Sequence, residues 1–171
     1  MNKQTEQELV IVEGDCNLLS KGPFIVTKTY FANGALKSEA HYQHEHLHGR
    51  SCFYTEEGQI LSESWFWQGK RVSVCLQFYP SGAPYAVLFY KTGEKEGKQV
   101  YFYENGQKKT GEEFSLGKLH GASILYWPNG QIKREAFFRQ GVRHGMDRMF
   151  DEQGNLLDEN QYVGGKCTET I

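Results

Sequence analysis

Four of the six histidines of the chain stand close together, at His41, His44, His46 and His48. In an extended segment the last three would alternate onto one side, where neutral imidazoles could bind a metal ion. No cysteine or aspartate accompanies them at the spacing of a ligand set. A solvated loop is the simpler interpretation, so the sequence predicts no metal and no other cofactor, although it leaves metal binding at His41–His48 open.

Carboxylates also recur, because Glu39, Glu63, Glu135 and Glu159 occupy one position of a 24-residue period. Glycosidases use two carboxylates about 5–9.5 Å apart. In a sheet with strands ~4.8 Å apart, Glu39 and Glu63 are expected ~10 Å from each other, and the period explains this spacing without chemistry. A glycine-rich segment at 93–98 lacks the spacing and the hydroxyl residue of a phosphate-binding loop. The sequence predicts no catalytic residues and no enzyme.

The period is set by six glycines at steps of 24 residues: Gly34, Gly58, Gly82, Gly106, Gly130 and Gly154. Two other columns keep the step and are aromatic in all six copies, although aromatic residues make up 14% of the chain. The first column is Tyr30, Tyr54, Phe78, Phe102, Tyr126 and Phe150, and the second is Tyr42, Phe66, Tyr90, Phe114, Phe138 and Tyr162. A fixed short period indicates a copied supersecondary unit that buries its apolar side against neighbouring copies.

The fifth copy shows which unit is repeated. Two β-rich runs flank Pro128–Gly130, whose residue types are typical of a three-residue hairpin loop, a type I turn closed by a glycine bulge. With that loop, Tyr126 stands opposite Ile132, and Phe138 is expected on the same face as both. Both aromatic columns are therefore predicted to form one apolar face, and residues 139–145 to form a looser turn into the next hairpin.

Consecutive hairpins predict an all-β fold, an elongated single-layer antiparallel meander of six 24-residue β-hairpin repeats with about twelve strands. Residues 1–8 are expected to be a disordered N-terminus, 9–29 one or two degenerate capping strands, and 30–171 the six-repeat ribbon. No Pro-rich or Ser-rich linker divides the repeats. One domain is therefore expected.

The repeated motif carries a family resemblance. Tyr126-x-x-x-Gly130, the later aromatic residue, and Gly-x-x-His-Gly at 117–121 and 141–145 resemble MORN-type repeats in their bacterial variant form, which is found in small antitoxin-like proteins. The resemblance implies a non-catalytic platform that binds other proteins, including an antitoxin- or chaperone-like role. Association with membrane lipid is proposed for some members of the family.

Charge and cysteine content limit the partners and the compartment. The formal net charge of −2 argues against binding to nucleic acid. Between Lys98 and Arg148, nine Lys or Arg face five acids, a local excess of four, so the alternative function is peripheral association with membrane phospholipid through the fourth and fifth repeats. The four cysteines, Cys16, Cys52, Cys75 and Cys167, share no motif or column, which predicts reduced thiols and a cytoplasmic protein.

Large aromatic residues also stand at positions predicted to lie opposite the two aromatic columns. We expect this second face to bind a partner protein, since contiguous exposed aromatic residues mark interaction sites. Homodimerisation, or burial by curling of the sheet, are the alternatives. Truncation of these side chains is expected to spare the fold. The predicted partner-binding residues are Trp65, Tyr79, Tyr85, Phe89, Tyr103, Trp127 and Phe137.

Overall fold

The computed structural model describes residues 5–11 and 23–170, which are all-β and contain no helix. They fall into two compact units, one up to residue 82 with 90–93, the other 83–89 with the residues from 94 onward. Strand β1 begins at Thr5, within the segment predicted to be disordered, whereas residues 1–4 of that segment lie outside the described residues. Residues 12–22 of the predicted capping segment also lie outside them.

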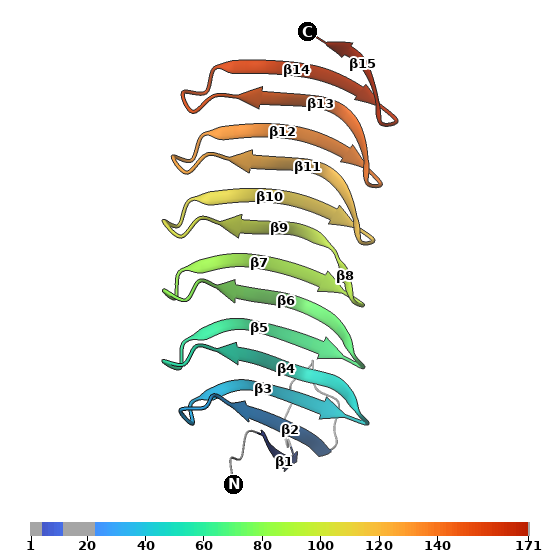
Figure 1. Ribbon diagram of the computed structural model, residues 1–171. Coiled ribbons are helices and arrows are strands. Elements are labelled where there is room, and N and C mark those ends of the chain that lie inside the picture. Colours follow the sequence, from blue (N-terminus) through green and yellow to red (C-terminus); the bar gives the residue numbers. More distant parts are fainter. Residues whose placement is uncertain (1–4, 12–22, 171) are drawn as a thin grey trace. The chain divides into compact units, whose positions relative to one another are not determined.

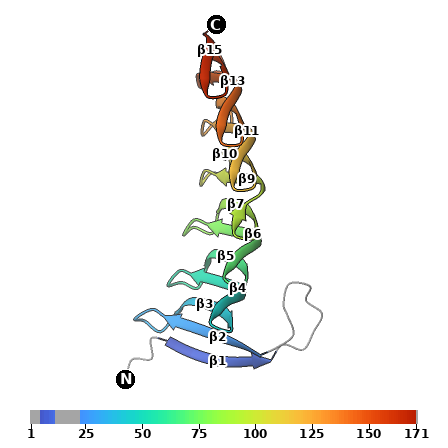
Figure 2. The same cartoon turned by 90° about the vertical axis from the view of Figure 1, so that its right-hand side faces the viewer.

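Each unit is an antiparallel meander in which strands follow one another in chain order (Figure 1). The first unit contains β1 (Thr5–Ile11), β2 (Pro23–Tyr30), β3 (Leu36–Gln43), β4 (His46–Tyr54), β5 (Ile60–Trp67) and β6 (Lys70–Phe78). The second contains most of β7 (Pro84–Lys91), then β8 (Glu94–Lys95), β9 (Gly97–Phe102), β10 (Lys108–Ser115), β11 (Lys118–Tyr126), β12 (Ile132–Arg139), β13 (Val142–Phe150), β14 (Leu156–Val163) and β15 (Lys166–Thr170). In Figure 2 the strands of the second unit lie in one layer, which confirms the predicted meander of hairpins.

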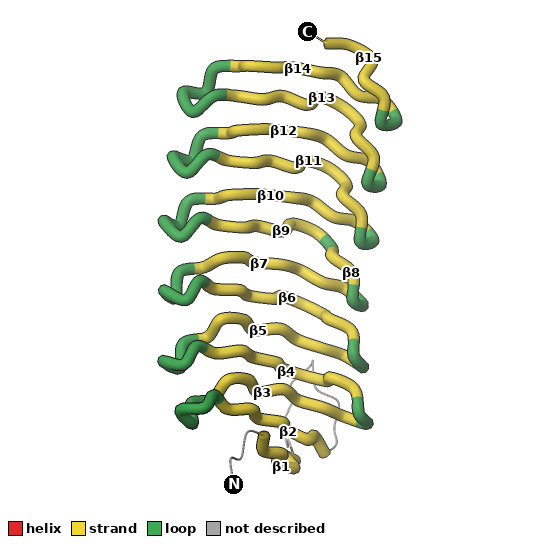
Figure 3. Tube along the Cα trace, viewed as in Figure 1, coloured by secondary structure: helices red, strands yellow, loops and turns green. Residues whose placement is uncertain are grey.

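The strand and turn lengths explain the period. In the second unit, β10 has eight residues, the turn at 116–117 two, β11 nine and the connection at 127–131 five. These lengths sum to the 24 residues of one repeat. The five-residue connections and the two-residue turns lie at opposite ends of the strands in each unit, as Figure 3 shows.

The five-residue connection contains the predicted loop. The Gly130 N–H donates to the Trp127 carbonyl at 2.9 Å, and the Trp127 N–H donates to the Gln131 carbonyl at 2.8 Å, so residues 128–130 form a three-residue loop. Gly130 has φ +88°, in the left-handed region that glycine adopts without a steric penalty. Tyr126 pairs with Ile132, as predicted.

The prediction that both aromatic columns share a face is wrong, because a further β-bulge lies beside the loop in the hairpins β2–β3, β4–β5, β9–β10, β11–β12 and β13–β14. After the pair Tyr126 and Ile132, the next pair is Leu125 and Arg134, so one residue of β12 has no partner. An extra residue reverses which face the following side chains occupy. Tyr126 and Phe138 therefore lie on opposite faces, and the same register shift occurs after Tyr30, Tyr54 and Phe150.

We name the two faces of each unit by their residues. The glutamate face carries Glu39, Glu63, Glu135, Glu159 and the first aromatic column, and the serine face carries Ser51, Ser64, Ser123 and the second aromatic column. Small or polar side chains are buried on the serine face: Ser51, Ser64, Cys75, Ala86, Gln99, Ala136 and Asp147. The second aromatic column therefore shares its face with these buried small or polar residues.

The second connection is tighter than predicted. Leu116 and Gly117 form a two-residue loop between the paired residues Ser115 and Lys118, and both have positive φ, at 51° and 73°, which defines a type I′ turn. The Gly117 N–H donates to the Lys95 carbonyl of the preceding repeat at 3.1 Å. The turns at Gly69, Gly93, Gly141 and Gly165 are joined to the repeat before them by the same main-chain hydrogen bond.

Candidate functional site

The structure separates the seven predicted partner-binding residues into two groups, so the prediction that they form one face is wrong. Strand alternation from the paired residues places one group on the glutamate face. In the other group, Tyr85 contacts the ring of Tyr101 on the serine face, and Tyr79, Tyr103 and Trp127 directly follow residues of the first aromatic column. The glutamate-face group is Trp65, Phe89 and Phe137, and the serine-face group is Tyr79, Tyr85, Tyr103 and Trp127. Their role in binding a partner stays a prediction.

Two members of the serine-face group join neighbouring repeats. The Tyr103 hydroxyl donates to the Tyr126 carbonyl at 2.8 Å, and the Trp127 indole Nε1 donates to the Phe150 carbonyl at 3.2 Å. The Lys109 and Lys133 ammonium groups lie 5.7 and 4.1 Å from the ring centroids of Tyr103 and Trp127. Both aromatic side chains hold repeats together, so the expectation that their truncation spares the fold is not retained.

Tyr85 also makes contacts within the serine face. Its ring meets the Tyr101 ring edge-on with centroids 6.0 Å apart, and the Lys95 ammonium donates to the Tyr101 hydroxyl at 3.0 Å. These two rings and Lys109 line a hollow of about 240 Å³. Thr110 and Glu112 complete its lining, so the chemistry available there is cation–π contact and hydrogen bonding.

The glutamate-face group is more exposed. In the second unit Phe89 is 44% exposed and Phe137 is 36% exposed, and both lie in one repeat column. Phe137 packs against Gly145, where an added Cβ would lie 3.1 Å from the Phe137 Cβ. Trp65 occupies the same column of the first unit and is half-buried opposite Arg50. Phe89 and Phe137 thus present large apolar side chains on one face of one unit.

A hollow of about 290 Å³ lies on the same face of the second unit, over Gly111. Val100 and Ile124 stand directly opposite Gly111 on the two neighbouring strands and form apolar walls. Lys98 and Lys108 also line the hollow. Glu112 and Glu113 line it as well, so two carboxylates balance the two ammonium groups around the apolar walls.

The glutamates of the repeat column are paired with basic side chains. Arg50 Nη2 donates to Glu63 Oε2 at 3.1 Å, and this hydrogen bond raises the pKa of Arg50. Glu39 lies 3.6 Å from the His41 imidazole, and Arg148 pairs with Glu159. The Arg50–Glu63 and Arg148–Glu159 pairs join neighbouring strands and stabilise the sheet, whereas Glu39 and His41 lie on the same strand, β3.

The cations of the fourth and fifth repeats do not share a face. Lys98 and Lys108 line the hollow on the glutamate face, whereas Lys109 and Lys133 lie over rings on the serine face. Arg134 is committed to an internal ion pair on the serine face, described next. The local positive charge predicted from the sequence is therefore divided between the two faces.

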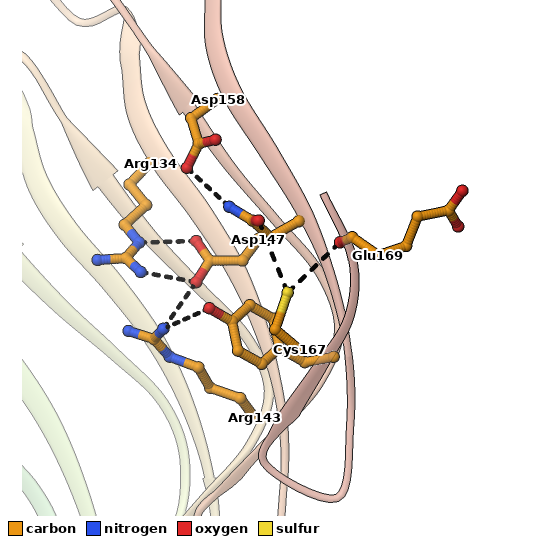
Figure 4. Close-up of polar contacts among 8 residues, drawn as sticks. Arg134, Arg143, Asp147, Asp158, Cys167 and Glu169 are labelled. Carbon is orange, nitrogen blue, oxygen red and sulfur yellow. Dashed lines mark hydrogen bonds and ion pairs between the residues drawn. The ribbon is translucent and has the colours of Figure 1, made fainter. Parts of the chain in front are cut away.

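A buried carboxylate lies at the centre of the polar contacts in Figure 4. Asp147 accepts two hydrogen bonds from Arg134, at 2.7 and 2.6 Å, and lies 3.3 Å from Arg143. Arg143 in turn donates to the Tyr162 hydroxyl at 3.3 Å. The hydrogen bond to Asp147 raises the pKa of Arg134. Because the carboxylate already binds two guanidinium groups, this cluster is structural.

The histidine cluster lines a polar hollow of about 390 Å³ in the first unit. His44, His46 and His48 line it, together with two glutamines, but no group of three His, Cys, Asp or Glu within residues 5–11 and 23–170 has the geometry of a metal site. His48 is buried between the Phe24 and Trp67 rings, with centroids at 5.8 and 4.4 Å. Burial, and to a smaller extent His44, lowers the pKa of His48.

Sequence reasoning missed the hollow over Gly111. The signal was present as two departures from the repeat in one hairpin: Gly111 stands in the glutamate column, and Lys108 stands where four of the other copies have Leu or Ile. Neither departure indicates a site until strand pairing places Gly111 between Val100 and Ile124, and Lys108 opposite Phe102.

Comparison with known proteins agrees with the repeat architecture. No curated protein matches the chain. In the part that the structure describes, no helix has the length and hydropathy of a membrane span. Proteins with MORN repeats are generally non-catalytic scaffolds for interaction with proteins or membranes. The antitoxin-like subfamily stays a prediction. The family model of the MORN repeat variant matches residues 26–44, 95–110 and 119–140, and over these three segments the chain is similar to that family.

Proposed function

We propose that the chain is a non-catalytic module that binds another protein through the glutamate face of its second unit. The observation that carries this proposal is the exposure of Phe89 and Phe137 on one face of a sheet layer. Large aromatic residues dominate the binding energy of protein interfaces, because each buries a wide apolar area at a low cost in side-chain entropy. An antitoxin- or chaperone-like role is one form of this function, and it depends on which partner is bound.

Site-specific cross-linking tests the proposal. A photoreactive phenylalanine analogue at position 89 or 137 is expected to form a covalent adduct with one defined partner in cells. The double variant Phe89→Ser/Phe137→Ser is expected to lose that partner in affinity capture. Its control is Leu125→Ser/Met149→Ser, which removes apolar side chains of similar exposure, 38% and 36%, from the serine face of the same unit. Equal capture by the two double variants contradicts the proposal.

Attachment to anionic phospholipid is the alternative function, and it must be distinguished from protein binding. Flotation with phosphatidylserine vesicles at low salt reports it directly, since binding by exposed lysines weakens as salt screens the charges. Flotation together with no cross-linked protein assigns the chain to lipid. The homodimer stays a prediction, and light scattering after size-exclusion chromatography measures the molar mass that tests it. The cytoplasmic location also stays a prediction.

A further inference from the structure

The three-residue loops differ in the residue that precedes the glycine. Asparagine stands there in the first, fourth and fifth copies, at Asn33, Asn105 and Asn129, whereas the other copies have Glu, Ser or Gln. Asparagine is a thermolabile residue, and it deamidates most readily before glycine, which has no side chain to hinder the attack of its nitrogen on the amide. All three asparagines are exposed. Three loops therefore carry the residue pair that this reaction needs.

Deamidation consumes only water. The glycine nitrogen loses its proton to hydroxide and forms a bond to the asparagine Cγ. The bond between Cγ and Nδ2 then breaks, and Nδ2 leaves as ammonia after taking a proton from water. A second water opens the resulting succinimide ring at either carbonyl, which gives aspartate or isoaspartate. Both products place a carboxylate where a neutral amide stood, and isoaspartate also adds one carbon to the main chain.

Two hydrogen bonds restrain the reacting groups in each of these loops. In the fifth copy the Gly130 N–H donates to the Trp127 carbonyl at 2.9 Å. Asn129 Oδ1 accepts from the Gln131 N–H, also at 2.9 Å. The loops of the first and fourth copies have the same two hydrogen bonds. Because the glycine nitrogen and the asparagine amide must both be released before they react, the deamidation rate of a loop depends on how readily that loop opens.

The loops differ in the hydrogen bond that joins the asparagine to the next loop. Asn129 Nδ2 donates to the main-chain carbonyl of Glu152 at 2.9 Å, and Asn105 Nδ2 donates to a main-chain carbonyl of the next loop at 3.1 Å. Asn33 Nδ2 instead donates to an exposed side chain, at 3.4 Å from Glu56 Oε2, which is longer than the usual range of about 2.7–3.2 Å. The amide of Asn33 is therefore the least restrained of the three.

The loops also differ in whether a side chain of the preceding repeat covers the glycine. A Cβ added at Gly130 would lie 3.0 Å from Gln107 Oε1, so the Gln107 side chain lies against this loop. A Cβ added at Gly106 or Gly34 would have no described atom within 4 Å. Ala83 stands one period before Gln107 and is too short to cover the loop of the fourth copy. The fifth loop thus has a main-chain hydrogen bond and a covering side chain, the fourth has the hydrogen bond alone, and the first has neither.

We infer that Asn33 is a site of spontaneous deamidation in the folded chain, and that the fold protects Asn105 more and Asn129 most. A carboxylate formed at position 33 can only accept hydrogen bonds, as the Glu56 carboxylate does, so the hydrogen bond between them is lost and the two like charges repel. The modification therefore separates the loop of the first repeat from that of the second and leaves the later loops joined.

Incubation of the full chain at mildly alkaline pH tests the inference, because hydroxide removes the glycine proton. Peptide mapping by mass spectrometry measures the deamidation rate of each asparagine, and an isoaspartate-specific methyltransferase identifies the product. Asn33 is expected to react about threefold to tenfold faster than Asn105, the factor expected from one hydrogen bond, and Asn105 faster than Asn129. In the chain unfolded by urea the three rates should converge, because glycine follows each asparagine.

Two variants exchange the covering side chain between loops. Ala83→Gln should slow the reaction at Asn105 to about the rate at Asn129 and leave Asn33 unchanged. Gln107→Ala should raise the rate at Asn129 to about that at Asn105. Thermal unfolding of both variants checks that the fold is retained. Equal rates in the folded chain, a different order, an order that persists in urea, or no response to either variant would each overturn the inference.

Discussion

At the scale of single residues, Gln99 replaces strand pairing that is interrupted between β8 and β9. Its Oε1 accepts from the Phe89 N–H at 3.0 Å, and its Nε2 donates to the Phe89 carbonyl at 3.1 Å and the Glu96 carbonyl at 3.1 Å. The side chain is completely buried. One amide side chain thus satisfies both main-chain groups of Phe89.

Gln99→Met should therefore destabilise the chain, although it nearly preserves side-chain size. Buried polar groups left without partners cost about 1–3 kcal/mol. Urea unfolding followed by circular dichroism measures the loss, with Gln153→Met as the control, since the Gln153 side chain is exposed. Equal stability of the two variants would show that water replaces the amide of Gln99.

His48 predicts a pH dependence of stability in the first unit. Its lowered pKa means that the folded state binds fewer protons than the unfolded state between that pKa and the unfolded value of about 6.5. This contribution is complete above pH about 6.5 and is lost as the pH falls through the lowered pKa. His48→Gln should flatten the curve of unfolding free energy against pH.

His120→Gln is the matched control, because His120 stands in the same repeat column and is exposed. Unfolding curves between about pH 5 and 7, on either side of the reference value, compare the variants. If both histidine variants show the same dependence of unfolding free energy on pH as the parent chain, the buried His48 does not cause that dependence.

At the scale of elements, the two-residue turns carry non-glycine residues with positive φ: His44, Glu45, Gln68, Thr92, Leu116 and Gln140. Asparagine tolerates this conformation better than leucine does, and Leu116 is also 69% exposed, so its side chain gains little from burial. Leu116→Asn is expected to raise the unfolding free energy by up to about 1 kcal/mol. Thermal unfolding measures the change.

Leu116→Ala separates backbone strain from exposure, because alanine removes the apolar side chain but retains the unfavourable φ. It should give no comparable gain. A gain of the same size from alanine would attribute the effect to the exposed leucine instead.

The repeated hairpin was accessible from the sequence, because Pro128–Gly130 and the glycine columns determine local turn geometry. The faces were not accessible, because the bulge beside Ile132 and Arg134 leaves no characteristic residue type in the sequence. One unpaired residue was enough to place Phe138 on the other face. A register prediction therefore fails at the first bulge that it omits.

The same limit applies to the candidate site. Phe89 and Phe137 were identified from their residue type, whereas Tyr103 and Trp127 were misread as free, since hydrogen bonds to carbonyls 23 residues away cannot be seen in a column of aromatic residues. Gly111 was missed because the absence of a side chain is informative only once its neighbours are known.

At the scale of the whole molecule, the extensive contacts of each described strand are with its neighbours in chain order. Stability in such repeat arrays is a sum of terms between adjacent repeats, so damage remains local. Ala136→Asp, which places a second carboxylate beside Asp147, should therefore increase amide exchange in β11–β14 and leave β3–β5 protected.

Ser64→Asp gives the reciprocal test, since Ser64 is buried in the same column of the first unit. Hydrogen exchange read by mass spectrometry should then rise in β4–β6 and stay unchanged in β11–β14. Uniform loss of protection in both units from either variant would show that the chain unfolds as one cooperative body.

The place of the hollow also has a genetic consequence. The column that contains Gly111 holds glutamate in four copies, at Glu39, Glu63, Glu135 and Glu159, and valine at Val87. Codons for glutamate, valine and glycine can differ at the second base alone. A single nucleotide substitution at codon 111 can therefore place a valine or glutamate side chain in the hollow of the fourth repeat without altering the scaffold.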